Sequence, residues 1–509
     1  MPLAQPINAP APCKAPALPL LLRWVAVLLL MPLPASLCGQ TDGMDVEARL
    51  SLSRREPKPL WFEYVYTSRG LATLSYMSRH STREVGLYYY NKDFDRQWRR
   101  RVYENNGRRN IAHLAVLGDQ ILVFVDERKP RENLIQTYFY QFNLEGKQIA
   151  DQTLMLSESE ASRGKKKVRF ARSVDKRHLV GYVERIGRES PEALTFFRFT
   201  EGEAKVTEGV IDLGIPDEDI VVEELKVGTF GNLFILARID EREGNRRTGR
   251  FRYQIYRYEP EEDSLSTYPL NYGDRHVTDL LFKLDPAENI ILGGFYSERS
   301  SNQLIGAIYQ RISTGTGETL ALNMQRFPEE FLKRYLNERQ LERGRELNDF
   351  YLDNLVLRSD GGMLLLAEQY YVTSSSFRDV HGFWYSRDQF HYDDIMVVSL
   401  SRQGVIEWIT PIEKQQIGEY PRELSFAHFI SGTQIYFFFK TRMRGFGTNV
   451  YYSTVDFDGR SEPPKPFFER FRNNDVFYRK ACEQISNHKG LIVFLENRGK
   501  VFTMLKVAF

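Results

Sequence analysis

Short apolar runs separated by polar turns dominate the chain, and they are clearest between Asn110 and Leu156. Four runs of apolar and aromatic residues follow one another there, with breaks at Gly118-Asp119, Lys129-Pro130 and Glu145-Gly146. Runs of four to eight such residues between Gly and Pro turns are typical of β-strands joined in antiparallel order. The pattern therefore predicts four consecutive strands in this stretch.

The second of these runs recurs along the whole chain, at a spacing of roughly 50 to 58 residues apart from two longer steps of about 70, which is the range of propeller blades. The runs are Leu71–Tyr76, Ile121–Val125, Leu179–Val183, Leu233–Ala237, Ile290–Gly294, Met363–Ala367, Ile435–Phe439 and Leu491–Leu495. Repeating four antiparallel strands around a ring leaves only short, protected sheet edges. We therefore predict an all-β protein, a β-propeller of about eight four-stranded blades, with seven as the alternative.

The two ends of the predicted propeller complement each other. The last repeat offers three strands, in Val476–Ser486, Leu491–Leu495 and Val501–Phe509, and then stops. The alternating segment Met44–Leu52 precedes the first complete repeat and has no partner of its own. We predict that this N-terminal strand closes the last blade as its outer strand.

Two insertions interrupt the single propeller domain expected over residues 40–509. The first, 324–350, contains Pro328–Leu347, which is rich in helix formers and places Phe331, Tyr335 and Leu336 at helical spacing. It predicts a helix that packs on one rim or, alternatively, binds a partner. The second insertion, 370–392, is expected to be a long loop.

The first 39 residues have the pattern of a secretory signal peptide. Lys14 and Arg23 precede the apolar run Trp24–Leu33, small residues follow, and we place cleavage before Gln40. A transmembrane anchor is the rival interpretation, but Arg23 interrupts the run and the remainder is short for a bilayer span. We expect export to the periplasm, the outer surface or the extracellular space.

The sequence gives little indication of a lipid anchor, or of a membrane-spanning helix after the signal peptide. A lipid anchor at Cys38 is disfavoured because Leu37 stands where a small residue is expected. No later stretch is apolar enough to cross a membrane as a helix. After signal removal Cys482 is the only cysteine, so the exported chain would have no internal disulfide.

Composition excludes one class of partner and permits a large core. The hydrophobic fraction is 42% and the aromatic fraction 13%, with 28 Tyr and 34 Phe, which favours strands. The formal net charge is +2, so there is no basic excess of the kind that binds nucleic acid. We expect a monomer that binds no nucleic acid.

The second insertion concentrates the candidate binding residues. Exposed aromatic side chains can stack on sugar rings or fill a pocket of a partner, and loops on a rigid scaffold often carry function. The alternative is that these side chains form a small core of the insertion itself. The candidates are Tyr371, Phe377, His381, Phe383, Trp384, Tyr385, His391 and Tyr392.

Metal and catalytic signals are weak. Asp379, His381, His391, Asp393 and Asp394 offer nitrogen and oxygen ligands, but their spacing matches no defined site. No Gly-x-Ser-x-Gly motif frames a serine, and nothing indicates a cofactor. We therefore predict no metal and no cofactor, and we leave the catalytic residues unassigned.

The sixth repeat combines Asp360–Tyr371, the aromatic insertion, His391–Val398 and Gly404–Trp408. This combination has a resemblance to a group of uncharacterised, secreted propeller-like proteins of Bacteroidetes. It implies export and a propeller fold, and it carries no activity.

These observations favour an exported binding or scaffolding module that recognises a glycan or a cell-envelope protein through its rim. The alternative is an extracellular polysaccharide hydrolase or lyase with its site over the central channel. Carboxylates, His or Arg converging on that channel from several blades would favour the enzyme.

Overall fold

A computed structural model describes residues 44–52, 63–79, 82–105, 108–159, 168–184, 191–203, 206–243, 246–299, 303–378, 380–443, 447–467, 475–496 and 501–509. All of them belong to the unit Gln40–Phe509. The expected signal peptide, its cleavage point and Cys38 lie outside the described residues. No described helix combines the length and the hydrophobicity that crossing a bilayer requires.

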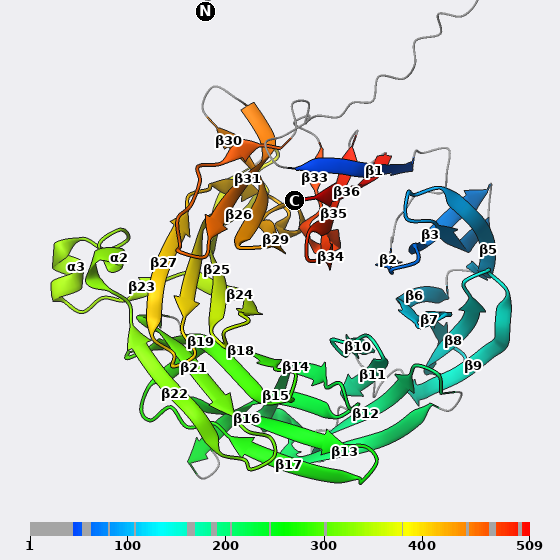
Figure 1. Ribbon diagram of the computed structural model, residues 1–509, viewed down its shortest axis with the longest axis horizontal. Coiled ribbons are helices and arrows are strands. Elements are labelled where there is room, and N and C mark those ends of the chain that lie inside the picture. Colours follow the sequence, from blue (N-terminus) through cyan, green and yellow to red (C-terminus); the bar gives the residue numbers. More distant parts are fainter. Residues whose placement is uncertain are drawn as a thin grey trace, which may run out of the picture. The chain divides into compact units, whose positions relative to one another are not determined.

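The described strands form eight main sheets and one two-stranded ribbon (Figure 1). The first four sheets contain β2 (Glu63–Tyr66), β3 (Leu71–Arg79), β4 (Thr82–Tyr90) and β5 (Arg96–Asn105); β6 (Arg109–Leu117), β7 (Gln120–Lys129), β8 (Leu134–Asn143) and β9 (Gln148–Ser159); β10 (Arg169–Arg172), β11 (His178–Glu184), β12 (Pro191–Thr200) and β13 (Thr207–Pro216); β14 (Ile220–Val227), β15 (Leu233–Glu243), β16 (Arg246–Glu259) and β17 (Ser264–Pro269). The next three contain β18 (His276–Leu284), β19 (Ile290–Ser297), β21 (Gly306–Ile312) and β22 (Thr319–Arg326); β24 (Phe350–Leu357), β25 (Met363–Arg378), β26 (Trp384–Leu400), β27 (Ile406–Ile412) and β28 (Gln416–Gly418); β29 (Phe426–Ser431), β30 (Gln434–Met443), β31 (Gly447–Asp456) and β32 (Lys465–Pro466).

The eighth sheet joins both ends of the described chain. It contains β33 (Val476–Phe477), β34 (Glu483–Ser486), β35 (Lys489–Glu496), β36 (Val501–Ala508) and β1 (Asp45–Leu52). The ribbon pairs β20 (Gln303–Leu304) with β23 (Leu347–Asn348), and three short 3-10 turns are η1 (Asp217–Asp219), η2 (Pro421–Glu423) and η3 (Arg479–Ala481).

The predicted repeat is confirmed strand by strand. Each of the eight apolar runs forms the second strand of its sheet: β3, β7, β11, β15, β19, β25, β30 and β35. The stretch Asn110–Leu156 forms β6 to β9, hydrogen-bonded in chain order as predicted. The fold is therefore an all-β propeller with eight blades.

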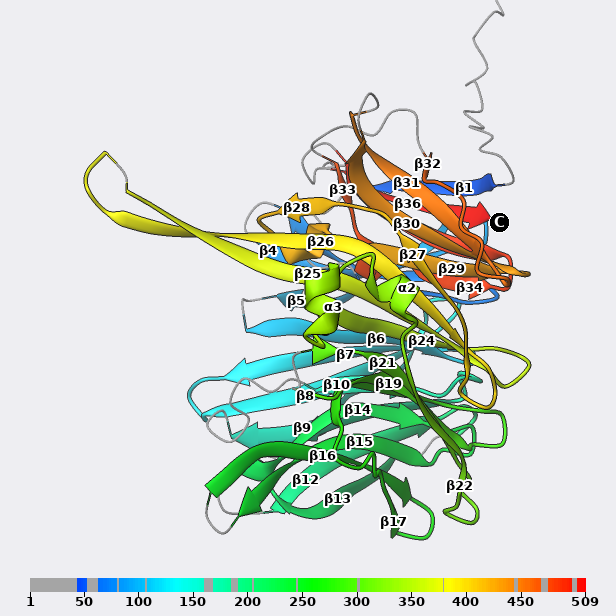
Figure 2. The ribbon, with the colours of Figure 1, turned by 90° about the vertical axis from the view of Figure 1, so that its left-hand side faces the viewer.

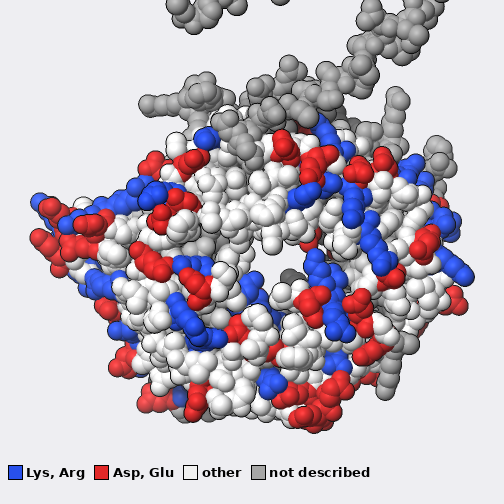
Figure 3. All heavy atoms as spheres, in the orientation of Figure 1, with Lys and Arg blue, Asp and Glu red and all other residues white. Residues whose placement is uncertain are grey.

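Apolar clusters join neighbouring sheets in a closed cycle in the described part of the chain. Separate clusters join the first sheet to the second, the second to the third and the third to the fourth. One large cluster extends from the fourth sheet through the fifth to the sixth. Further clusters join the sixth to the seventh, the seventh to the eighth, and the eighth back to the first. The sheets therefore surround a central opening, which is visible in the space-filling view (Figure 3).

The N-terminal strand closes the last blade, as predicted. β1 pairs antiparallel with β36, from Asp45 opposite Ala508 to Leu52 opposite Phe502. The sheet order β1-β36-β35-β33 makes β1 its outer strand. The two ends of the propeller are thus held together by backbone hydrogen bonds and by the burial of Leu50.

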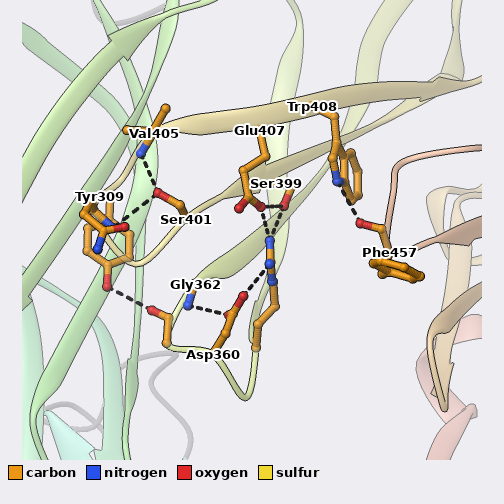
Figure 4. A network of polar contacts seen from close by, with 12 residues as sticks. Tyr309, Asp360, Gly362, Ser399, Ser401, Val405, Glu407, Trp408 and Phe457 are labelled. Carbon is orange, nitrogen blue, oxygen red and sulfur yellow. Dashed lines mark hydrogen bonds and ion pairs between the residues drawn. The ribbon is translucent and has the colours of Figure 1, made fainter.

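Side chains also bridge neighbouring blades near their turns (Figure 4). The indole N–H of Trp408 donates to the carbonyl oxygen of Phe457 in the turn after β31, at 3.0 Å. The hydroxyl of Tyr309 in β21 donates to the carbonyl oxygen of Gly361, just before β25, at 3.0 Å. These contacts fix the turns of one blade against the strands of its neighbour.

The prediction of one helix over Pro328–Leu347 is wrong. Two short helices form instead, α2 (Glu329–Leu332) and α3 (Glu338–Glu342). Asn337 explains the break, because its extended backbone ends the first helical turn and its side chain accepts from the Gln340 N–H in a capping box. The insertion packs on the rim, as one of the two alternatives expected, and buries Leu332 in the large apolar cluster.

The prediction that residues 370–392 form a loop is also wrong. β25 and β26 continue the ladder of the sixth sheet as far as Arg378 opposite Trp384, so the segment is a long β-hairpin. It projects well beyond the neighbouring strands in Figure 2. The aromatic residues, Val372 and Thr373 of this segment favour paired strands over an irregular loop.

Candidate functional site

The protruding end of the β25–β26 hairpin, residues 373–389, is here called the hairpin arm. Nearer the ring, β28 extends the sheet by pairing with Phe390–Tyr392 of β26. Beyond Phe390, no other strand of the described chain pairs with the arm. The arm is therefore a two-stranded ribbon presented outside the body of the propeller.

Aromatic side chains are exposed at the tip of the arm. Phe377 lies opposite Tyr385, and their rings stack with centroids 5.7 Å apart. Both are about half exposed, and Phe383 and Trp384 are 65% and 71% exposed. Val380 at the turn is 96% exposed. These five side chains are here called the aromatic tip, and a group of exposed apolar side chains on one segment is typical of an interaction site.

The other predicted binding residues separate from that tip. His381 is exposed at the turn, whereas Tyr371, His391 and Tyr392 are partly buried at the root of the hairpin. The ring of Tyr371 stacks on His391 with centroids 4.4 Å apart. Six residues separate Tyr371 from Phe377 along an extended strand, which amounts to roughly 20 Å. The structure thus divides the predicted site into an exposed tip and a packed root.

A buried ion pair anchors the root. The ammonium of Lys414 lies 2.6 Å from Glu368, and neither side chain is more than 6% exposed. The same ammonium donates to the carbonyl oxygen of Tyr392 at 2.8 Å and to Gln416 at 3.0 Å. It therefore ties β26 to β28 at the point where the arm leaves the sheet.

The residues considered as metal ligands have other partners. Asp393 accepts from the hydroxyl of Tyr371 at 3.1 Å, and Asp394 accepts from the hydroxyl of Tyr335 at 3.0 Å. Asp379 lies outside the described residues. In the ranges that the structure describes, no three His, Cys, Asp or Glu side chains gather as a metal site would require.

A second site lies at the central opening, where residue patterns in the sequence did not reveal it. A cavity of about 530 Å³, here called the channel cavity, is lined by the first strands β2, β6 and β10 of three blades and by η3 and β34 of the eighth. Among its lining residues are Glu63, His113, Arg172, Lys480 and Glu483. Acidic, basic and imidazole groups from four blades thus converge on one cavity.

Glu63 and His113 form a pair in this cavity. The imidazole Nδ1 lies 3.6 Å from a Glu63 carboxylate oxygen, and each side chain is about one-third exposed. Burial raises the pKa of Glu63 to about 7, although the Leu114 N–H donates to it. Burial lowers the pKa of His113 to about 4, and the positive Arg172 acts in the same direction. Near neutral pH the imidazole is uncharged and the carboxyl group is close to half protonated.

The imidazole is also held from the other side. The ring of His113 stacks on Phe170 of β10, with centroids 4.4 Å apart and planes 20° apart. Phe170 in turn packs against Phe124 of β7. The second and third blades therefore fix the orientation of the ring.

Arg172 of the third blade and Glu483 of the eighth also line the cavity. One Arg172 amino group donates to the carbonyl oxygen of Lys176 at 3.2 Å and also contacts that of Val116. Its buried Nε has no hydrogen-bond partner. Burial raises the pKa of Glu483, against the effect of Lys176 and Arg172. Neither Arg172 nor Glu483 forms an ion pair within the described ranges.

One signal in the sequence could have pointed to part of this cavity. Glu63 and His113 precede the apolar runs of their repeats by the same offset and stand opposite the equivalent residues Leu74 and Phe124. Aligning the first strands of the repeats would have placed both polar side chains at one level of the channel. Arg172 and Glu483 share another level, opposite Leu179 and Leu491.

Comparisons with known proteins bear on the fold of the chain and not on its function. No protein-family model and no curated protein matches the sequence. Among solved structures, the chain is similar to the WD40 domain of SCAP from fission yeast, at 10% identity and a TM-score of 0.40, covering 90% of this chain and 98% of that one. It is also similar to the β-propeller domain of the trilobed protease from Pyrococcus furiosus, at 12% identity and a TM-score of 0.37, covering 81% and 99%. Similarity at this level carries no argument about activity or partners.

Proposed function

We propose that this β-propeller is an exported binding module that captures a protein partner with the aromatic tip of its hairpin arm. The observation that carries the proposal is the exposure of Phe383 and Trp384, at 65% and 71%, on a ribbon outside the ring. Aromatic anchors of this kind dominate the energetics of protein interfaces. Export rests on the N-terminal charge and apolar pattern described above.

The shape of the arm favours a protein over a glycan as the partner. Sites for small ligands are concave and surround most of the ligand. The hairpin that carries the aromatic tip projects from the molecule (Figure 2), so its side chains can enter a groove in another protein. The alternative that these side chains form a core of their own is disfavoured, because Phe383 and Trp384 are largely exposed.

A second candidate function is the polysaccharide hydrolase or lyase with its site over the channel. The convergence of Glu63, His113, Arg172 and Glu483 from four blades favours a chemically active channel. A carboxyl group with a pKa near 7 is suited to general acid–base catalysis at neutral pH. Loss of polysaccharide cleavage in Glu63→Gln, with binding through the hairpin arm retained, would identify this function.

Replacing Phe383, Trp384 and Tyr385 by Ala should abolish partner binding and leave the melting temperature unchanged. Each buried aromatic anchor contributes about 2 kcal/mol at an interface, so the affinity should fall at least roughly thirtyfold. The parent and the variant are compared for capture of cell-envelope proteins, and the captured protein is purified and titrated by calorimetry. A glycan array tests the competing class of ligand.

Phe230→Ala is the matched control, since Phe230 is an equally exposed aromatic residue (71%) in the turn before β15. It should bind like the parent. Equal binding by the triple variant would exclude the aromatic tip as the site. A lower melting temperature of the triple variant would show instead that the aromatic side chains stabilise the fold.

A further inference from the structure

The channel cavity contains unpaired charges of both signs. Glu63, Glu483, Arg172 and Lys480 line it, and none of them forms an ion pair with another of the four. The only charged-group contact of Glu63 in the described ranges is the 3.6 Å approach to His113. The scaffold thus holds these four acids and bases around one open volume without a direct ion pair among them.

The acids and the bases differ in how they can respond to burial. A carboxyl group escapes the cost of burial by taking up a proton, and the pKa values of Glu63 and Glu483 are both raised by burial. An arginine cannot lose its proton at physiological pH. Arg172 therefore stays charged, with a buried Nε–H that donates to nothing. A buried donor without an acceptor destabilises the fold, and more so when it belongs to a charged group.

The balance of charge in the cavity is therefore positive at and below neutral pH. Arg172 and Lys480 carry positive charge, His113 is neutral, Glu63 is about half protonated near neutral pH, and burial raises the pKa of Glu483. A protonated Glu63 also becomes a hydrogen-bond donor. The ligand that satisfies this arrangement is an anion that accepts hydrogen bonds.

The rest of the wall indicates an organic anion. Phe170, Leu114, Ala115 and Leu179 contribute apolar surface to the same cavity. A volume of about 530 Å³ is far larger than an inorganic ion needs and lies within the range of small-molecule sites. A carboxylate matches the planar guanidinium of Arg172 and can carry an apolar or sugar-like body.

We propose that the channel cavity binds a small organic carboxylate, whose carboxylate group contacts Arg172 and Lys480 while protonated Glu63 donates to it. The site is separate from the hairpin arm, so it stands whether or not the arm binds a protein. The carboxylate belongs either to an acidic sugar or to the C-terminus of a short peptide.

Calorimetric titration of the full chain at pH 6 and pH 8 tests this proposal. The probes are glucuronate and N-acetyl-trialanine for the two sources of carboxylate, with glucose and inorganic phosphate for comparison. One of the two carboxylates should bind, and its affinity should be about tenfold weaker at pH 8, because the protonated fraction of Glu63 falls from about 0.9 to about 0.1 as the pH passes 7. The other titratable groups that line the cavity are Tyr64 of the same strand, His113, Arg172, Tyr478, Lys480, Cys482 and Glu483.

Three variants identify the groups involved. Glu63→Gln should bind the carboxylate and lose most of the pH dependence. Lys480→Gln should weaken binding at least threefold, and Arg172→Lys should weaken it tenfold or more, because an ammonium cannot reproduce the planar, bidentate contact of a guanidinium with a carboxylate. Arg131→Gln and Glu203→Gln, at exposed turns away from the cavity, should match the parent.

Four results would overturn the proposal. They are binding of glucose equal to that of glucuronate, binding of phosphate alone, an unchanged pH dependence in Glu63→Gln, and no binding of either carboxylate to the parent. Lys480 is exposed and Glu63→Gln preserves the shape of the side chain, so these two variants give an answer even if Arg172→Lys fails to fold.

Discussion

Deletion of residues 44–52 is expected to lower the melting temperature by about 5 °C and to expose the edge of β36. Met44 and Leu50 are 2% and 7% exposed, and burying such side chains stabilises a protein by about 1.5–3 kcal/mol each. The deletion also uncovers Phe502 and Met504, which are buried in β36. A total loss of roughly 5 kcal/mol corresponds to a shift of about 5 °C in a protein of this size, because the entropy of unfolding grows with chain length. Calorimetry of the variant and the parent measures it.

A point substitution separates the loss of the strand from the loss of chain length. Leu50→Asp should destabilise the protein by several kcal/mol, because the carboxylate would enter the apolar cluster between the eighth and first sheets. Asp45→Asn at the exposed start of β1 is the control and should have no effect. Unchanged melting of both the deletion and Leu50→Asp would show that the ring does not depend on β1.

Lys414→Met is expected to destabilise the protein by about 3–5 kcal/mol at neutral pH, because it leaves the carboxylate of Glu368 buried without a cation. Burial already raises the pKa of Glu368, and Lys414 opposes that effect. Without Lys414 the pKa of Glu368 should rise further above its ordinary value of 4.5. Chemical denaturation at several pH values measures the loss.

The loss should depend on pH in a defined direction. Below pH 4.5 Glu368 is protonated in both the folded and the unfolded chain, so the penalty for the lone carboxylate is absent, and it grows as the pH rises towards neutral. Adding Glu368→Gln should recover part of the stability. Lys465→Met, which removes an exposed pair with Glu462 at 2.9 Å, is the control and should cost at most about 1 kcal/mol. A loss independent of pH in Lys414→Met would contradict the role given to the pair.

The repeat could be predicted from the sequence because the second strand of each blade is buried on both faces. Ile121–Val125 and Leu233–Ala237 are entirely buried, so selection for burial leaves an uninterrupted apolar run that can be recognised alone. The pairing of β1 with the last blade could be predicted by counting strands, because the last repeat supplies only three of the four strands of a blade. The two wrong predictions, the single helix and the long loop, concern segments whose structure the spacing of apolar residues does not determine. Asn337 ended a helix through its capping geometry, and the arm formed strands through cross-strand pairing.

The channel cavity could not be predicted from the sequence because its polar residues are single departures from the repeat pattern, and they lie in four different repeats. His113 and Arg172 each stand in a short first strand with ordinary neighbours, and neither belongs to a recognisable motif. Their relation appears only when the ring brings the strands together. The aromatic tip, by contrast, is continuous in sequence, so its residues could be predicted even though its conformation was not.

Site-specific cross-linking tests the central claim, capture of a protein by the aromatic tip, most directly. A photoreactive amino acid is placed at Trp384 of the otherwise unchanged protein and, in a second sample, at Phe230. After irradiation with cell-envelope proteins, we predict one dominant protein adduct at position 384 that is absent at position 230 and is displaced by excess unlabelled parent. No adduct at position 384, or the same adducts at both positions, would contradict the account.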